Sequence, residues 1–535
     1  MKDSSKHSAI WGSVKGLLLC SALLTSIAFM AAPAAADSCS DLASLALPNT
    51  TITTAQSIAS GRFIPPGSST AIINLPAFCR VAAFVTPTSD SHIDFEVWIP
   101  KSIWNGKYAQ EGCGGWCVSI PYGAMADPLR RGYAVAATDD GTGALSPTDA
   151  SWANGHPEKV NDWAYRAVKV THDDAEAIVA AFKSSGPRRS YFEGCSTGGR
   201  QALVEAQQYP QDFDGLIGGS PASIPPAIIV GFVWNFLALT ETPDSSLTQS
   251  DLNILSSAVL TQCAGHDGGL ATDQFLNNPP ACKFNPESLL CTGNTTSSCL
   301  SEAKVAAIKK IYSGPPNIFP GYQVNEGTEA VLWPAGFVGQ QSFFENFFSE
   351  WVFANSGWTP TSTTINQDLS AANASTAGIT NFTNPDLTAF QKRGGKLIQY
   401  VGWSDPLISA LNDINYYTSV TDVIGDLGAT EQFYRLFMVP GMGHCAGGPG
   451  ANAFGLGLNG PSPSDPSDDM LSALAQWVEQ EIAPDKIIAT KYVNDNPANG
   501  VAFQRPLCPY PQIAQYSGSG DATQANNWMC VEPRQ

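Results

Sequence analysis

The stretch GCSTGGRQ, which begins at Gly194, constrains the fold of this chain more than any other segment. The residues SYFEG that run into it are typical of a strand, and RQALVEAQQYP after it is typical of a helix. Glycines at 194 and 198 permit a sharp turn that lifts the hydroxyl of Ser196 out of the end of a sheet. The next amide, that of Thr197, then lies at the helix start, where it can donate to an oxyanion. The segment therefore predicts a strand, a strained turn carrying a nucleophile, and a helix.

Strand and helix patterns alternate on both sides of this turn. Strand patterns lie at 92–100, 133–140, 190–194, 396–402 and 434–439. Apolar residues recur at helical spacing between Ala167 and Phe182, and again near 470–482. This βαβ order predicts an α/β fold with a mostly parallel sheet covered by helices.

The middle of the chain, about residues 222–390, departs from this order. It contains four cysteines and many Asn, Ser, Thr and Pro residues. The spacing of aromatic residues such as Phe344, Phe348 and Trp351 is typical of a helix that packs its own core. We expect a lid domain at 222–390, inserted between two parts of the α/β core at 37–221 and 391–535.

The first 36 residues are typical of an export signal peptide. Lysines at 2, 6 and 15 supply positive charge, residues 16–30 are apolar, and small residues end at Ala36. No later segment approaches about 18 uninterrupted apolar residues, so we expect no membrane insertion. The mature protein is therefore expected to be secreted or periplasmic.

The charge of the chain restricts its partners. The formal net charge is −19, and only 14% of residues are charged. An acidic protein of this kind is repelled by a phosphate backbone, so nucleic acid is not expected as a partner.

The cysteine count also indicates export. Of the thirteen cysteines Cys20 lies in the signal, and an even number remains, as expected where disulfides form. Sequence alone leaves the pairing open, although short loops favour four pairs. These are Cys113 with Cys117, Cys263 with Cys282, Cys291 with Cys299 and Cys508 with Cys530.

A serine nucleophile requires a base that takes its proton. In folds of this class the order along the chain is serine, acid, histidine, which leaves His266 and His444. His266 lies in a polar loop bounded by cysteines, whereas His444 follows the strand pattern YRLFMVP in the turn GMGHC. We therefore assign His444 as the base.

The acid that orients this base is expected after the preceding strand. The stretch KLIQYVGWSD ends on Asp405. Its competitors lie farther from the strand end, at Asp413, Asp422 and Asp426. We therefore assign Asp405 as the acid.

Two further cysteines flank the assigned groups. Cys195 precedes the serine and Cys445 follows the histidine. If the three groups assemble, the two sulfurs come close, and a disulfide between them would join the two catalytic turns.

With these motifs the chain resembles the tannase and feruloyl esterase family of α/β-hydrolases, which includes the mono(2-hydroxyethyl) terephthalate hydrolase. The resemblance rests on GCSTGGRQ, GWSDPLIS and VPGMGHCAGGPG, with support from IWNGKY and RPLCPYPQIAQYSGSGD. It implies an α/β-hydrolase core with a large inserted lid and Ser196, Asp405 and His444 as catalytic triad. It also implies disulfides Cys195–Cys445 and Cys39–Cys79. The stretch QEGCGGWC resembles the family's first oxyanion loop, which implies that Gly115 donates one amide and Thr197 the other.

The resemblance also implies a calcium loop in the lid. The corresponding stretch is CAGHDGGLATDQF, which has Ala264 where the family carries an acid, and one or two extra residues. We expect Ca²⁺ to be held by carboxylates and backbone carbonyls. The expected ligands are Asp267, Gly269, Ala271, Asp273 and Phe275. No organic cofactor is expected.

The family cleaves esters of aromatic acids, and the lid sequence bears on which ones. No lysine or arginine lies between Lys310 and Lys392, where the family's terephthalate enzyme carries an arginine for a free carboxylate. This favours a neutral acyl group, because burying an unpaired carboxylate is costly. We expect a secreted serine carboxylester hydrolase of the feruloyl esterase type, acting through an acyl-enzyme on small aromatic esters or phenolic-decorated plant polymers. The alternatives are a tannase acting on galloyl esters, a terephthalate-monoester hydrolase, and a non-catalytic secreted protein that binds phenolics or carbohydrates.

Overall fold

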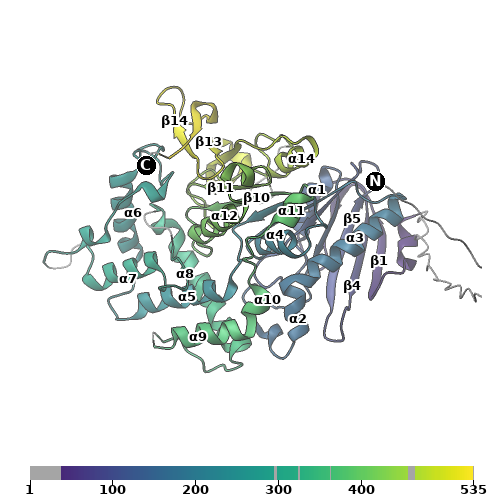
Figure 1. The fold of residues 1–535 in the computed structure, drawn as a ribbon, viewed down its shortest axis with the longest axis horizontal. Helices are drawn as coiled ribbons and strands as arrows, with labels where there is room; N and C mark the ends of the chain where they lie inside the picture. The colour runs from purple at the N-terminus through teal and green to yellow at the C-terminus, as the bar shows by residue number, and fades with distance from the viewer. Residues whose placement is uncertain (1–37, 294–297, 323–325, 362, 456–463, 534–535) are drawn as a thin grey trace, which may run out of the picture. The chain divides into compact units, whose positions relative to one another are not determined.

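A nine-stranded sheet is the centre of the fold (Figure 1). The computed structural model describes residues 38–293, 298–322, 326–361, 363–455 and 464–533. The predicted signal peptide, residues 1–36, lies outside the described residues. In spatial order the strands are β1 Thr50–Ile58, β4 Phe78–Val85, β5 Ile93–Pro100, β7 Ala134–Thr138, β6 Lys107–Glu111, β8 Arg189–Cys195, β9 Gly215–Gly219, β10 Lys396–Gly402 and β11 Tyr434–Val439.

The pairing of these strands divides the sheet into two parts. β1, β4, β5 and β7 pair antiparallel, whereas every pair from β7 through β6, β8, β9 and β10 to β11 is parallel. The prediction of an α/β fold with a mostly parallel sheet is therefore confirmed. Among the residues that the structure describes, three two-stranded ribbons lie outside this sheet: β2 Gly61–Phe63 with β3 Ile72–Leu75, β12 Ile487–Tyr492 with β13 Val501–Leu507, and β14 Ile513–Tyr516 with β15 Trp528–Val531.

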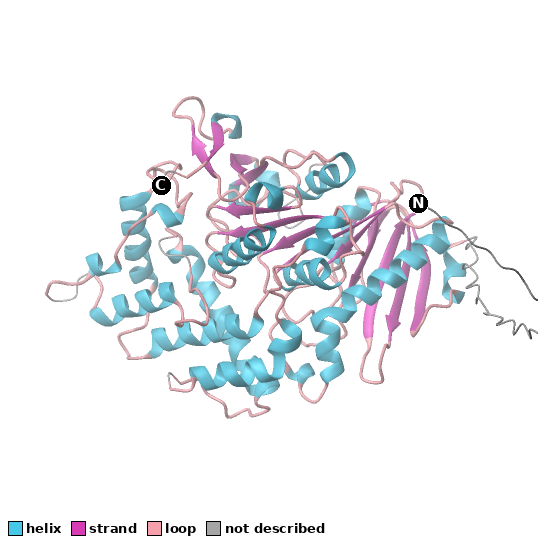
Figure 2. Cartoon of the chain, viewed as in Figure 1, coloured by secondary structure: helices cyan, strands magenta, loops and turns pink. Residues whose placement is uncertain are grey.

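Helices cover both faces of the sheet (Figure 2). They are α1 Tyr122–Arg130, α3 Ala167–Lys183, α4 Thr197–Gln208, α12 Ala410–Ile424, α13 Leu427–Glu431 and α14 Met470–Gln480. The short helix α2 Pro157–Asn161 precedes α3 along the chain and buries Val160 in a separate cluster. Because side chains alternate along a strand, Phe95 and Val97 of β5 pack with α3 and α4, whereas Trp98 packs with α1 and α14 on the other face.

The described chain between β9 and β10 contains helices and no strand. These are α5 Pro225–Thr240, α6 Gln249–Cys263, α7 Glu302–Ser313, α8 Glu329–Asn346, α9 Ile365–Ala372, α10 Gly378–Thr380 and α11 Thr388–Lys392. We call this part, Pro225–Lys392, the helical insertion. Its aromatic residues Phe344, Phe348 and Trp351 are buried in a cluster that the insertion shares with the α/β part, where Trp351 packs against Trp116, Trp152 and Trp163.

Short 3₁₀ and π-helical turns complete the chain. They are η1 Cys39–Ser44, η2 Ser151–Ala153, η3 Asp162–Arg166, η4 Pro279–Ala281, η5 Pro286–Leu289, η6 Phe347–Val352, η7 Asn373–Ala377, η8 Val493–Asp495, η9 Pro497–Asn499 and η10 Ala525–Asn527. Among the described residues, no helix is both long and apolar enough to cross a membrane.

Candidate active site

Ser196 lies in a strained turn between β8 and α4. Its backbone has φ 64° and ψ −116°, a conformation that L residues rarely adopt. The turn depends on glycine, because a Cβ on Gly194 would lie 2.7 Å from the Cα of Gly198. This is the geometry of a nucleophile elbow, in which the serine side chain stands clear of the sheet edge.

Two backbone amides next to this turn are free to donate. Thr197 is the first residue of α4, where an N–H has no acceptor within its own helix. Gly115 has φ +57°, and a Cβ there would lie 2.5 Å from the carbonyl oxygen of Pro147. The Thr197 hydroxyl donates to the Gly115 carbonyl oxygen over 2.7 Å, which joins the two segments. Within the described part of the chain, neither of the two N–H groups has a hydrogen-bond acceptor.

The predicted acid and base form a hydrogen-bonded pair. His444 Nδ1 lies 2.8 Å from Asp405 Oδ2, and Asp405 is buried. The other oxygen, Asp405 Oδ1, accepts the N–H groups of Leu407 and Ile408 at 2.8 and 2.9 Å. The carboxylate is therefore held from both sides, and it fixes the orientation of the imidazole ring.

The competing residues do not meet at this site. His266, Asp422 and Asp426 are exposed, and Asp426 caps α13 by accepting the N–H of Ala429. Asp413 lies in α12, where burial and the nearby Asp405 raise its pKa well above the ordinary value. Of these described acids, Asp405 is the one that is hydrogen-bonded to His444.

A disulfide between Cys195 and Cys445 joins the serine turn to the histidine turn across 250 residues of sequence. Ser196 and His444 line the same cavity, although no hydrogen bond connects the serine hydroxyl with the imidazole in this structure. Such bonds are often long without substrate. The other ten cysteines of the described residues form Cys39–Cys79, Cys113–Cys117, Cys263–Cys282, Cys291–Cys299 and Cys508–Cys530.

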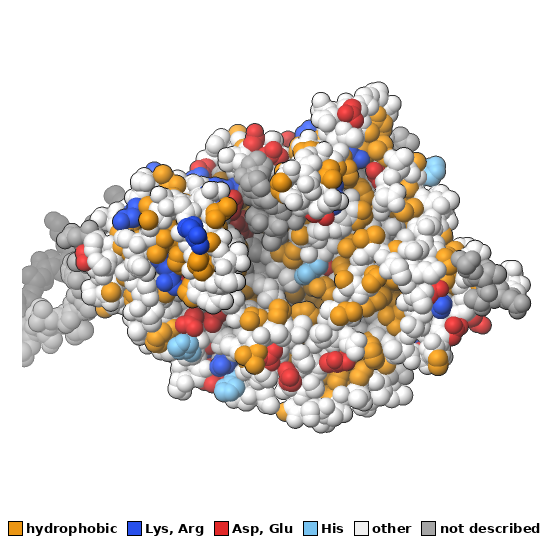
Figure 3. All heavy atoms as spheres, turned by 180° about the vertical axis from the view of Figure 1, so that it is seen from behind, with side chains coloured by type: hydrophobic (Ala, Val, Ile, Leu, Met, Phe, Trp, Pro, Cys, Tyr) orange, Lys and Arg blue, Asp and Glu red, His pale blue; other side chains and the backbone are white. Residues whose placement is uncertain are grey.

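The cavity beside Ser196 has a volume of about 410 Å³. The face in Figure 3 is hollowed near its centre, where hydrophobic side chains gather around a histidine. Besides the catalytic candidates, α5 supplies Pro225, Ile228, Ile229 and Phe232, and other segments supply Trp116, Trp163, Phe343, Leu407 and Ile408. Sequence reasoning did not find these wall residues. Only Trp116, next to Gly115, carried a signal that could have found it.

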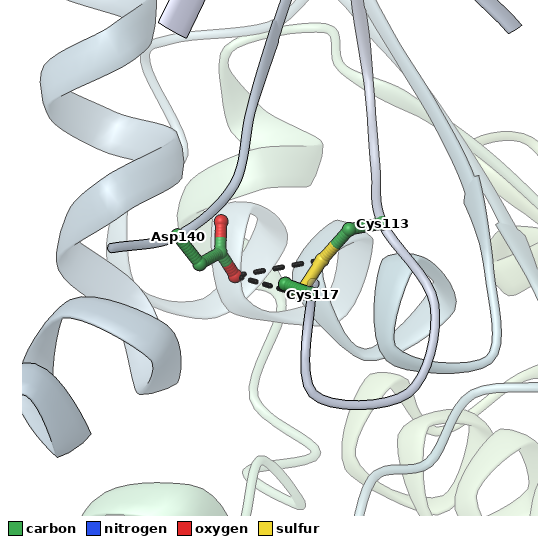
Figure 4. A group of neighbouring side chains, drawn as sticks. All are labelled: Cys113, Cys117 and Asp140. Atoms are coloured by element: carbon green, nitrogen blue, oxygen red, sulfur yellow. Dashed lines mark hydrogen bonds between the residues drawn. A yellow bond between two sulfur atoms is a disulfide. The ribbon is translucent and has the colours of Figure 1, made fainter. Parts of the chain in front are cut away.

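Asp140, next to the loop that carries Gly115, is another residue that the sequence did not indicate. Its Oδ2 lies 3.2 Å from Cys117 Sγ and 3.6 Å from Cys113 Sγ, beside the disulfide that closes the Gly115 loop (Figure 4). Burial raises the pKa of Asp140 well above its ordinary value. Although these three groups cluster like metal ligands, the disulfide leaves no thiolate to coordinate a cation.

The predicted calcium ligands lie in the loop closed by Cys263–Cys282. Asp267 Oδ1 accepts the Gly269 N–H at 3.1 Å, and Asp267 Oδ2 accepts the N–H groups of Asn277 and Asn278. Asp273 accepts the Leu270 N–H and forms an ion pair with Arg505 at 3.3 Å. Burial raises the pKa of Asp273, and Arg505 opposes this shift. The predicted ligand atoms are all oxygens, which is the type of ligand that calcium prefers. Two of the predicted ligands are carboxylates, and Arg505 already pairs with one of them, which weakens the site for a cation.

These features define the class of the protein. A mostly parallel sheet with a strained serine turn after one strand, and an Asp–His pair after later strands, is an α/β-hydrolase. The model of the family "Tannase and feruloyl esterase" matches residues 79–531. The chain belongs to this family, and it is a carboxylic ester hydrolase.

Individual relatives agree with this assignment. An uncharacterised esterase of Xanthomonas campestris pv. campestris is 38% identical over 94% of this chain and 93% of its own length. A probable feruloyl esterase B-2 of Aspergillus terreus is 32% identical over 85% of this chain and 86% of its own. The crystal structure of feruloyl esterase B from Aspergillus oryzae covers 92% of this chain and 99% of its own, with 31% identity and a TM-score of 0.82.

Proposed function

We propose that the protein is an exported serine esterase that hydrolyses esters of neutral, hydroxycinnamic-type aromatic acids through an acyl-enzyme. One observation carries this proposal. The Ser196 hydroxyl, the His444 ring and the two residues with free amides, Gly115 and Thr197, all line a single cavity with apolar walls. The names of the relatives, probable feruloyl esterase B-2 and feruloyl esterase B, support this substrate class.

The reaction would proceed in two steps of acyl transfer. His444 takes the proton of Ser196 as the serine oxygen attacks the ester carbonyl, and the Thr197 and Gly115 amides stabilise the oxyanion. His444 then gives this proton to the departing alcohol, which leaves an ester on Ser196. Water, deprotonated by the same histidine, releases the aromatic acid. Asp405 stays ionised and stabilises the imidazolium in both steps.

The charge of the cavity favours a neutral acyl group over a terephthalate monoester. Of the described residues that line it, none is lysine, arginine, aspartate or glutamate. The free carboxylate of a terephthalate would therefore lose its hydration without gaining a cationic partner.

We propose export because the described residues form six disulfides, and disulfides form and persist in oxidising compartments. The substrate would then be a small aromatic ester or a phenolic-decorated plant polymer outside the cell. We further propose that Ca²⁺ binds Asp267 and Asp273 with carbonyls of Gly269, Ala271 and Phe275. It would cross-link this loop and take no part in the reaction.

The proposal is tested with purified protein and methyl ferulate. Ser196→Ala is expected to lower kcat by about 10³-fold or more, because the nucleophile is lost. Ser220→Ala, a buried serine that follows the neighbouring strand β9 and does not line the cavity, is the matched control and should retain activity. Turnover by Ser196→Ala at the wild-type rate would contradict the proposal, as would a preference for the terephthalate monoester.

A further inference from the structure

We propose that Glu111 and Glu193 share a proton beneath the active site and act as positioning residues for the reaction. The hydrogen bond between their carboxyl groups fixes the loop that carries Gly115 against the turn that carries Ser196. The pair thereby holds the Gly115 amide where it can donate to the oxyanion. This inference rests on the proposed function, because it concerns the geometry of the same serine site.

The two glutamates lie side by side at the ends of neighbouring strands. Glu111 is the last residue of β6, and its partner in the parallel pairing with β8 is Glu193. The residues two positions earlier on each strand pack with α1 and α14, so both carboxyl groups lie on that face of the sheet. Glu111 precedes Gly115 by four residues, and Glu193 precedes Ser196 by three. The pair therefore lies directly below both catalytic segments.

A hydrogen bond joins the two carboxyl groups. Both residues are buried, with exposed fractions of 5% for Glu111 and 4% for Glu193. No other described residue donates a hydrogen bond to Glu111 Oε1 or to Glu193 Oε2. Ionised carboxylates only accept hydrogen bonds, so a bond between two of them requires a proton.

The proton of this bond resides on Glu111. Burial and the neighbouring carboxylate of Glu193 raise the pKa of Glu111 well above its ordinary value. Burial also raises the pKa of Glu193, to about 7, while the hydrogen bond with Glu111 opposes this shift. Two adjacent carboxyl groups in a dry site cannot both ionise without strong repulsion. Glu111 therefore donates, and Glu193 accepts.

The surroundings provide no free cation for the pair. Its titratable neighbours are Asp127 and Arg131 at α1, Asp469 at the start of α14, Tyr133 before β7 and Tyr400 in β10. Arg131 forms an ion pair with Asp127 at 2.7 Å and donates to both oxygens of Asp469 at 2.6 and 2.7 Å. One guanidinium thus serves two aspartates already, and ionisation of both glutamates would leave a large negative charge in the interior.

The backbone between the pair and the active site has no slack. The Gly112 N–H donates to the Glu193 carbonyl oxygen at 2.8 Å, which continues the pairing of β6 with β8 by one residue. The next carbonyl, that of Cys113, accepts the Gly198 N–H at 2.7 Å. A Cβ on Gly112 would lie 2.7 Å from the Gly198 Cα, so the two backbones are in direct contact. A change in the spacing of the pair is therefore passed on to the loop that carries Gly115.

The first experiment removes the hydrogen bond and then restores it, with p-nitrophenyl acetate as substrate. Glu111→Leu should lower kcat about 10²-fold, because a misplacement of about 1 Å costs this much. KM should change by less than about threefold, since neither glutamate lines the cavity. Glu111→Gln, whose amide still donates to Glu193, should retain kcat within about threefold. Wild-type kcat in Glu111→Leu, or an equal loss in Glu111→Gln, would overturn the inference.

Glu205 provides the matched control. It lies in α4, it is buried, and burial raises its pKa well above the ordinary value. Neither of its oxygens has a hydrogen-bond partner among the described residues, and it does not line the cavity. Glu205→Leu should therefore shift Tm and leave kcat within about twofold of wild type. A loss of kcat as large as that of Glu111→Leu would mean that removal of any buried carboxyl has this effect, which would overturn the inference.

A double variant tests whether the pair acts through the Gly115 amide. Gly115→Ala displaces this amide directly, because a Cβ there would lie 2.5 Å from the Pro147 carbonyl oxygen. Glu111→Leu then has little left to displace, so the double variant should lose kcat to within about threefold of the larger single loss. Losses that multiply would show that the two residues act independently, which would overturn the positioning role.

The pair also predicts a change in the pH dependence of stability, which needs no variant of Glu111. Glu193 binds its proton more tightly in the folded chain than in the unfolded chain, so stability falls as the pH rises from the ordinary pKa of glutamate to about 7. Glu193→Gln lacks this proton, and between about pH 5 and about pH 8 its Tm should fall by about 3 °C less than that of the wild type. Equal falls in Tm would overturn the shared proton.

Failure of this inference can be distinguished from failure of the proposed function. Ser196→Ala tests the function with the same substrate. If Ser196→Ala abolishes hydrolysis while Glu111→Leu keeps the wild-type kcat, only the positioning role is wrong. If Ser196→Ala retains hydrolysis, the proposed function fails as well.

Discussion

Asp405 and Asp267 are both buried carboxylates that accept backbone hydrogen bonds, but they are used differently. Asp405 directs one oxygen to two N–H groups and the other to His444. Asp267 directs both oxygens to N–H groups of its own loop. Burial and backbone hydrogen bonds are therefore common to both carboxylates. The two differ in that Asp405 has an oxygen left for a titratable partner, His444.

Replacement of each carboxylate by its amide gives the largest contrast. Asp405→Asn should lower kcat for methyl ferulate by about 10⁴-fold, because an amide can neither select the imidazole tautomer nor stabilise the imidazolium. Asp267→Asn should change kcat by less than about tenfold and lower Tm instead, because one of its oxygens becomes a donor facing N–H groups. Equal losses of kcat in the two variants would contradict the different roles given to Asp405 and Asp267.

The backbone amide of the oxyanion loop gives the next largest effect. Gly115→Ala places a Cβ against the Pro147 carbonyl, and the displaced N–H should cost about 10²- to 10³-fold in kcat. Gly114→Ala is the control, because a Cβ at Gly114 meets no atom within 4 Å. If Gly115→Ala kept the wild-type kcat, the Gly115 amide would have no part in the mechanism.

The disulfide between the serine and histidine turns and the disulfide around Asp267 extend the comparison to stability. Cys195–Cys445 closes 250 residues, whereas Cys263–Cys282, around Asp267, closes 19. In the chain-entropy model, replacing the first pair by alanine should reduce the free energy of unfolding by about 2 kcal/mol more than replacing the second. Denaturant titration of the two double variants measures this difference. A larger loss from the second pair would mean that strain or residual structure dominates over chain entropy.

Calcium should give the smallest effect. Returning Ca²⁺ to protein treated with EDTA should raise Tm by about 1–3 °C, because the site has two carboxylates and Arg505 already pairs with one of them. Asp273→Asn should remove this response and leave kcat for p-nitrophenyl acetate unchanged. A calcium response that persists in Asp273→Asn would place the ion elsewhere.

The sheet and the residues of the serine, aspartate and histidine turns were predictable because each has a local pattern. Alternating apolar residues specify β5, and the small residues around Ser196 specify the turn after β8. The order of serine, acid and histidine along the chain left His266 and His444, and the strand patterns that precede His444 and Asp405 then selected these two residues. These assignments needed only the geometry that one strand and its following turn impose.

The cavity wall was not predictable in the same way. Ile229 of α5, Phe343 of α8 and Trp163 of η3 come from three separate segments, and each lies in a pattern that predicts only a packed helix. The Asp273–Arg505 ion pair likewise joins residues 232 positions apart. Contacts of this kind depend on how elements pack, which no local pattern encodes.

The central claim, that Ser196 forms the acyl-enzyme, is tested most directly by trapping this ester. Protein mixed with p-nitrophenyl acetate is quenched in acid within the first turnovers, digested and analysed by mass spectrometry. The account predicts an acetyl group on the peptide that contains Ser196, and none on that peptide in Ser196→Ala. Hydrolysis with the acetyl group on another residue, or with no transient adduct on the Ser196 peptide at any quench time, would contradict it.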